Sequence, residues 1–95
     1  MIEYTHVEGK DKGPIQLYAL STCIWCRKTK KLLDSLNVAY DFVYTDLLDS
    51  DKRNEVLDEL EKWNPRVSFP VVVIQNKKAI VGFKEDKIRG ALEEK

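Results

Sequence analysis

The sequence predicts an α/β protein in which strands and helices alternate along a chain of 95 residues. The β-branched run Val71-Val72-Val73-Ile74 is typical of a buried strand. Leu32, Leu33 and Leu36, with Thr29, are spaced as on one face of a helix. The order expected along the chain is strand, helix, strand, helix, strand, strand, helix. A chain of this length should form one domain.

Residues 1–14 are expected to be an extension outside a main domain of residues 15–95. Ile2, Tyr4 and His6 alternate with polar residues, a pattern that allows a short extra strand. His6 is the single histidine of the chain and has no sequence partner for nucleophilic catalysis. We therefore expect His6 to be exposed or to have a packing role.

The first half of the domain is predicted to be a strand, a helix and a second strand. Residues 15–20 (IQLYAL) are mostly apolar and suit a central strand. Ser21 and Thr22 then supply hydroxyls where the helix over residues 24–36 needs its N-cap. Residues 38–45 (VAYDFVYT) are the second strand, and a right-handed crossover makes it parallel to the first.

The second half is predicted to be a helix, an antiparallel hairpin and a last helix. The expected ranges are helix 51–63, strand 71–74, strand 79–81 and helix 84–94. The polar residues 75–78 are a tight turn between the two strands. Gly90 in the last helix costs roughly 1 kcal/mol relative to alanine, so we expect it either to fray the helix or to allow close packing.

The charge balance excludes several classes of partner. Sixteen acidic and sixteen basic residues give a net charge of zero, which argues against a general nucleic-acid or membrane-surface binder. No apolar run approaches the roughly 20 residues of a membrane-spanning helix. The first ten residues also lack the apolar core of a signal peptide. We expect a cytoplasmic, monomeric protein with neither nucleic acid nor membrane as a partner.

Both cysteines of the chain, Cys23 and Cys26, lie where the first strand runs into the first helix. At this spacing on a helix, the two thiols share one face about one turn apart. A disulfide across three residues would restrain little chain, so redox chemistry is a better interpretation than a structural bridge. The alternative is a pair of merely buried cysteines. A closed zinc site needs four ligands, which two cysteines and the distant His6 do not supply, so no metal is expected.

Three motifs occur together in this order of elements: Cys-x-x-Cys after the first strand, Pro70 at the head of the third, and Gly82 after the fourth. With these motifs, the chain from Ile15 to Leu92 resembles the glutaredoxin branch of the thioredoxin superfamily. The resemblance implies a thioredoxin fold with a four-stranded mixed sheet in the order 2-1-3-4 and three flanking helices. It also implies a thiol–disulfide oxidoreductase that reduces protein or low-molecular-weight mixed disulfides.

Two departures from the glutaredoxin pattern affect the electron donor. Ile24-Trp25 stands where glutaredoxins commonly have Pro-Tyr, and the single Gly82 stands where they tend to have Gly-Gly. The second pattern is closer to the small redoxins that serve ribonucleotide reductase and are recharged by thioredoxin reductase. The resemblance thus implies disulfide-containing proteins as partners, ribonucleotide reductase among them. The donor is glutathione, another small thiol such as coenzyme M, or a flavoprotein reductase, and no bound cofactor is expected.

Cys23 is the predicted nucleophile. At the mouth of a helix, its sulfur faces unpaired N–H groups and the positive end of the dipole, which stabilise a thiolate. Arg27, one turn further on, adds positive charge. Cys26 is the predicted resolving thiol, which releases the product from a mixed disulfide. Trp25 either shields the pair and shapes the substrate groove or has an ordinary packing role.

The substrate-binding residues follow from the resemblance. Since few X–Pro bonds are cis, physics alone would predict a trans bond between Phe69 and Pro70. In the superfamily the corresponding proline is cis, and the backbone before it pairs with an extended substrate. Gly82 and Phe83 are expected to flank the site. Asp86 either holds the charged end of a small thiol or complements the dipole of the last helix.

Four positive charges, Arg27, Lys28, Lys30 and Lys31, lie within five residues of the first helix. They form either a solvated face or a surface that attracts an anionic thiol or an acidic partner protein. The alternative function is an iron–sulfur cluster-binding or cluster-carrier module, in which a dimer shares a cluster held by Cys23 and an external thiol.

Overall fold

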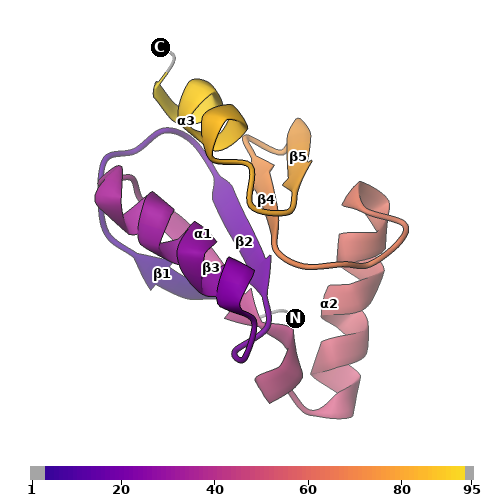
Figure 1. The fold of residues 1–95 in the computed structure, drawn as a ribbon. Helices are drawn as coiled ribbons and strands as arrows, with labels where there is room; N and C mark the ends of the chain where they lie inside the picture. Colours follow the sequence, from indigo (N-terminus) through magenta and orange to yellow (C-terminus); the bar gives the residue numbers. More distant parts are fainter. Residues whose placement is uncertain (1–3, 94–95) are drawn as a thin grey trace.

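The structure is a computed structural model that describes residues 4–93. Within these residues, five strands form one mixed sheet in the order β1-β3-β2-β4-β5, and three α-helices pack against it (Figure 1). The elements are β1 (Thr5–Val7), β2 (Ile15–Ala19), α1 (Ile24–Ser35), β3 (Tyr40–Tyr44), the 3-10 helix η1 (Thr45–Leu47), α2 (Ser50–Trp63), β4 (Val71–Ile74), β5 (Lys78–Val81) and α3 (Glu85–Glu93).

The sheet contains the predicted four-stranded core. β2 pairs in parallel with β3 and antiparallel with β4, and β4 pairs antiparallel with β5. Across the sheet, β3, β2, β4 and β5 are the second, first, third and fourth predicted strands. This confirms the expected order 2-1-3-4. The sheet has five strands rather than four, because the short extra strand that the sequence allowed before residue 15 forms as β1 and pairs antiparallel with β3.

The segment before β2 is joined to the sheet by more than β1. The nitrogen of Lys10 donates to the carbonyl of Asn37 at 2.8 Å, and the carbonyl of Lys10 accepts from the nitrogen of Ala39 at 2.8 Å. Gly9 lies so close that a Cβ there would be 2.5 Å from the carbonyl carbon of Val38. His6 is exposed, as expected, and its Nδ1 lies 2.8 Å from Asp41 Oδ1. Ile2, which the predicted strand included, lies outside the described residues.

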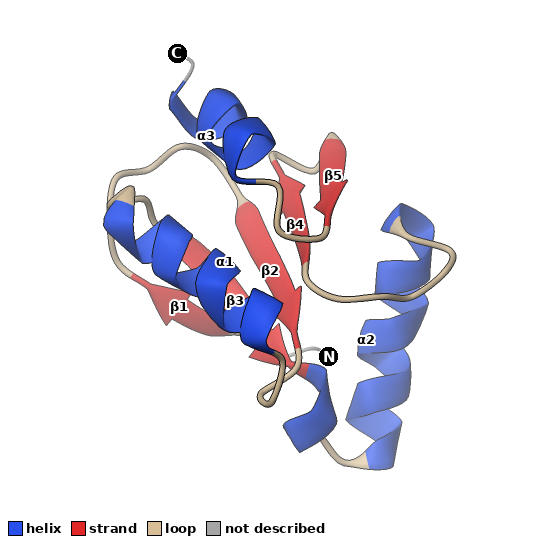
Figure 2. Ribbon diagram, in the orientation of Figure 1, coloured by secondary structure: helices blue, strands red, loops and turns tan. Residues whose placement is uncertain are grey.

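Helices cover both faces of the sheet, and each face has its own apolar core (Figure 2). On one face, α1 and α3 pack with residues that include Leu17, Leu33 and Ile88. On the other face, α2 contributes Val56 and Leu60. The four residues of β4 are all buried and alternate between the two cores, as a central strand requires.

Several element boundaries differ from the prediction by one or two residues. β3 begins at Tyr40 rather than at residue 38, because Asn37 has a left-handed φ of 63° and the next residues pair with Lys10. β5 begins at Lys78. The expectation that Gly90 allows close packing was wrong, because a Cβ there would meet nothing within 4 Å. The helix continues through Gly90 to Glu93, and residue 94 of the predicted helix lies outside the described residues.

A tight turn ends β4 and leads into β5. Gln75 and Asn76 both have positive φ, 56° and 53°, and the nitrogen of Lys77 donates to the carbonyl of Ile74 at 3.0 Å. Two successive left-handed residues are typical of the tight turns that match the twist of a hairpin. Among residues 4–93, no helix is both long enough and apolar enough to cross a membrane.

Candidate active site

Cys23 is the N-cap of α1. Its backbone is extended, with φ −90° and ψ 122°, and its Sγ accepts a hydrogen bond from the nitrogen of Cys26 at 3.2 Å. The prediction that Ser21 or Thr22 caps the helix was therefore wrong, because the sulfur occupies the place of the capping oxygen. This partly buried sulfur lies at the positive end of the helix dipole, where a thiolate is stabilised.

Ser21 instead bonds to a residue that sequence reasoning did not identify. Its nitrogen and Oγ donate to the two carboxylate oxygens of Asp46, at 2.8 and 2.5 Å. These hydrogen bonds from Ser21 hold the pKa of Asp46 below its usual value. Asp46 follows β3 and Ser21 follows β2, and parallel strands end at the same edge of a sheet. Topology could therefore have predicted this contact, which fixes the turn before Cys23.

Cys26 differs from Cys23 in its surroundings. Only 1% of its surface is exposed, and its Sγ accepts a hydrogen bond from the nitrogen of Leu20 at 3.5 Å. Burial, with a further contribution from the neighbouring Cys23, raises the pKa of Cys26 to about 12. Near neutral pH, Cys26 is therefore a protonated thiol inside the core, whereas Cys23 lies at the surface end of the same helical turn.

Five predicted site residues meet in one pocket of about 280 Å³. They are Trp25, Phe69, Pro70, Gly82 and Phe83. The ring of Trp25 stacks on that of Phe83, with centroids 6.0 Å apart and planes inclined by 28°. The Phe69-Pro70 bond is cis, as the resemblance implied.

Gly82 shapes this pocket through its backbone. Its φ is +85°, a left-handed conformation that glycine adopts without steric cost. Its nitrogen donates to the carbonyl of Pro70 at 2.7 Å, so the loop after β5 is tied to the start of β4. This bond holds Phe83, the next residue, beside the pocket.

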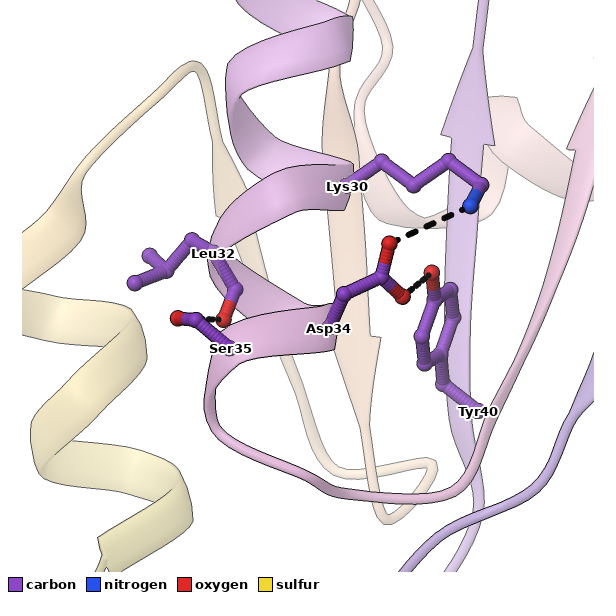
Figure 3. Close-up of polar contacts among 5 residues, drawn as sticks. All are labelled: Lys30, Leu32, Asp34, Ser35 and Tyr40. Atoms are coloured by element: carbon purple, nitrogen blue, oxygen red, sulfur yellow. Dashed lines mark hydrogen bonds and ion pairs between the residues drawn. The ribbon is translucent and has the colours of Figure 1, made fainter.

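The remaining predicted residues lie apart. Arg27 and Asp86 are exposed and do not line this pocket. The expected cluster of four positive charges is divided between the sides of α1. Nζ of Lys28 lies 5.0 Å from the centre of the Trp25 ring, whereas Lys30 points the other way, toward Asp34 and β3 (Figure 3).

Within residues 4–93, no three or more histidine, cysteine, aspartate and glutamate side chains come together in a way that could hold a metal ion. The two cysteines are free thiols, and a pair of thiols can exchange with a disulfide.

Comparison with known proteins agrees with the geometry. The family model described as Glutaredoxin matches residues 15–80. An uncharacterized glutaredoxin-like 8.6 kDa protein in the rubredoxin operon of Clostridium pasteurianum is 37% identical over 79 residues, which cover 83% of this chain and 97% of that protein. The crystal structure of the glutaredoxin from Methanosarcina mazei Go1 is 50% identical with a TM-score of 0.88, covering 94% of this chain and 86% of that one. Methanosarcina acetivorans methanoredoxin is 49% identical with a TM-score of 0.86, covering 88% of each chain. The chain therefore belongs to the glutaredoxin family of thiol–disulfide oxidoreductases.

Proposed function

We propose that this glutaredoxin reduces protein disulfides and low-molecular-weight mixed disulfides, with Cys23 as the attacking thiolate and Cys26 as the resolving thiol. The observation that carries the proposal is the asymmetry between the two sulfurs. Cys23 accepts the N–H bond at the start of α1, whereas Cys26 is buried with its pKa raised to about 12. This difference supports Cys23 as the attacking thiol and Cys26 as the resolving thiol.

The reaction has two exchange steps. The Cys23 thiolate attacks one sulfur of the substrate disulfide, the substrate S–S bond breaks, and the leaving thiolate takes a proton. The Cys26 thiol then loses its proton and attacks Cys23 Sγ. This releases the second substrate thiol and leaves a Cys23–Cys26 disulfide. Two electrons from an external thiol or a flavoprotein reductase restore the dithiol.

The structure gives a reason for this order of events. The hydrogen bond with Cys23 and the charge of its thiolate are two of the causes that raise the pKa of Cys26. When Cys23 enters a mixed disulfide, its negative charge is lost. Deprotonation of Cys26 then becomes easier at the step that needs it, while burial, the largest cause of its raised pKa, continues to act.

The pocket that contains Trp25, Phe69 and Pro70 is the proposed place for the substrate. An extended segment would pair with the backbone of Phe69, before the cis proline, in the manner of an added strand. Trp25, Gly82 and Phe83 would form its walls. Arg27 and Asp86, which lie outside the pocket, remain predictions as charged contacts for the ends of a small thiol.

Trapping with a Cys26→Ser variant tests the assignment of the two thiols. We expect this variant to accumulate a mixed disulfide on Cys23 when it is mixed with a protein disulfide, because the second step is blocked. Mass spectrometry of the digested complex locates the bond. A fully active Cys23→Ser variant would contradict the proposal.

The electron donor and the partners need a parallel assay. Reduction of a protein disulfide is measured with glutathione and its reductase, with coenzyme M, and with thioredoxin reductase; oxidised ribonucleotide reductase is included as a substrate. The donor that sustains turnover at the lowest concentration is the physiological class. Absorbance of freshly purified protein checks the alternative function, since an iron–sulfur cluster is coloured and a dithiol is not.

A further inference from the structure

A second pocket, of about 580 Å³, lies beside the first. The α1 residues Lys28, Lys31, Leu32 and Ser35 line it, together with Phe83 and Glu85 from the start of α3 and the loop before it. We call this pocket the α1–α3 groove. Phe83 also lines the pocket that contains Trp25 and Pro70, so the two pockets share a wall. A molecule that occupies the first pocket can therefore extend into the groove.

The α1–α3 groove has the form of a channel along the helix. Its α1 residues have the spacing i, i+3, i+4, i+7, which is one face of a helix over two turns, about 10 Å. Leu32, which is buried, and Phe83 make its apolar surface. Lys28 and Lys31 are exposed and supply charge at its rim.

The net charge that this groove offers is positive. The carboxylate of Glu85 is already paired with Arg89, at 2.8 Å between Oε2 and Nε. Lys28 lies over the Trp25 ring, and within the described part of the chain neither Lys28 nor Lys31 forms an ion pair. Two positive charges therefore remain for a ligand.

Lys30, on the same helix, differs from the groove lysines because its ammonium group is paired within the protein. Its Nζ is 3.3 Å from Asp34 Oδ2, and Tyr40 donates its hydroxyl to Oδ1 of the same carboxylate at 2.6 Å (Figure 3). The ammonium also lies 5.0 Å from the centre of the Phe42 ring. Lys30 belongs to the packing of α1 on β3 and is a matched control for the groove lysines.

We propose that the α1–α3 groove binds an acidic segment of a protein disulfide substrate. The inference rests on the proposed function, since it requires the substrate to be attacked at Cys23. Lys31 is eight residues beyond Cys23, about 12 Å along the helix axis. An extended chain covers this distance in three to four residues. The favoured substrate therefore has Asp or Glu three or four residues from the attacked cysteine, with apolar side chains against Leu32 and Phe83.

Synthetic peptides test this inference. Each peptide has one cysteine in a mixed disulfide with 2-thiopyridine, a neutral leaving group, and a Glu or a Gln three or four residues away on either side. Pre-reduced protein is mixed with peptide in a single turnover, so no donor is involved, and release of thiopyridone is followed by stopped flow. Two exposed ion pairs of about 0.5 kcal/mol each predict that the Glu peptide of one orientation reacts about fivefold faster at low salt. Salt should remove this preference.

Variants assign the effect to the groove. Lys28→Ser/Lys31→Ser should lose the preference for Glu over Gln, whereas Lys30→Ser, which removes a charge from the same helix, should keep it. Moving the Glu to a position next to the cysteine should also abolish the gain. Equal rates for Glu and Gln peptides in both orientations would overturn the proposal that the groove binds an acidic segment. They would not affect the proposed function. An equal gain at every Glu position, or with a small anionic disulfide, would show general attraction of anions and overturn it too. If thiopyridone is released without Cys23, the proposed function itself fails.

Discussion

The two faces of the sheet differ in how much apolar surface they leave exposed. On the face covered by α1 and α3, the site leaves large apolar groups uncovered: Ile24 is 60% exposed and Trp25 is 53% exposed. On the face covered by α2, Val56 and Leu60 are fully buried against the strands. The first face keeps surface free for a partner, which costs burial, and the second face provides apolar burial without such a demand. We therefore expect substitutions on the first face to change activity and those on the second to change stability.

The largest expected effect belongs to Cys23, the partly buried thiol on the first face. Cys23→Ser should abolish reduction of protein disulfides, because a hydroxyl cannot replace the attacking thiolate. The assay is turnover with whichever donor supports the unaltered protein. Far-UV circular dichroism is the control, since the substitution at this N-cap should leave the fold intact. Residual turnover above a few per cent in a folded variant would break the contrast.

Alkylation should separate the two sulfurs within one face. With a pKa of about 12, Cys26 carries only about one thiolate in ten thousand molecules at pH 8, and its side chain is buried. Iodoacetamide should therefore modify Cys23 alone from pH 6 to 9, which mass spectrometry of the intact protein reads as a single adduct. Because a raised pKa keeps the thiol protonated until strongly alkaline pH, a second adduct should appear only on unfolding or above about pH 10. Equal labelling of both cysteines at pH 7 would contradict this.

Leu60→Ala should have the largest effect on the second face. Leu60 is fully buried in the core beneath α2, and removing its side chain leaves a cavity. The free energy of unfolding should fall by about 2–5 kcal/mol, measured by urea denaturation. The rate per folded molecule should stay within twofold, since Leu60 does not line the pocket that contains Trp25 and Pro70. Loss of activity in the folded fraction would show that the two faces are coupled.

The smallest expected effect is that of a substitution at Gly90, on the exposed side of α3. Gly90 is exposed, its φ is not positive, and a Cβ there meets nothing within 4 Å. Gly90→Ala should therefore stabilise the protein by about 0.5–1 kcal/mol, since alanine loses less backbone entropy in a helix. The measurement is again urea denaturation, with activity unchanged as the control. Destabilisation would mean that the helix is strained at this point.

The sequence could predict what depends on local pattern and on the resemblance. The order of four strands, the three helices and the meeting of Trp25, Phe69 and Pro70 in one pocket followed from these. The N-cap could not be read in this way, because a sulfur competes with nearby hydroxyls for the same N–H groups. The contact between Ser21 and Asp46 needed the alignment of two parallel strand ends.

The basic cluster shows a different limit. Four positive charges close together in the sequence suggest a single basic surface. At 3.6 residues per turn, however, Lys28 and Lys30 lie on opposite sides of a helix. The period alone could have separated them. Which side faces the active site depends on how α1 packs against β3 and α3, and only the structure shows that.

The pairing of β1 with β3 affects how molecules of this protein meet one another. Without β1, the five-residue strand β3 would present unpaired backbone groups at the margin of the sheet. Such a margin is a template for strand addition by a second chain and hence for aggregation. The sheet instead ends in β1, of three residues, and β5, of four, with Lys78 exposed on β5. Short and charged margins of this kind disfavour edge-to-edge polymerisation of the protein.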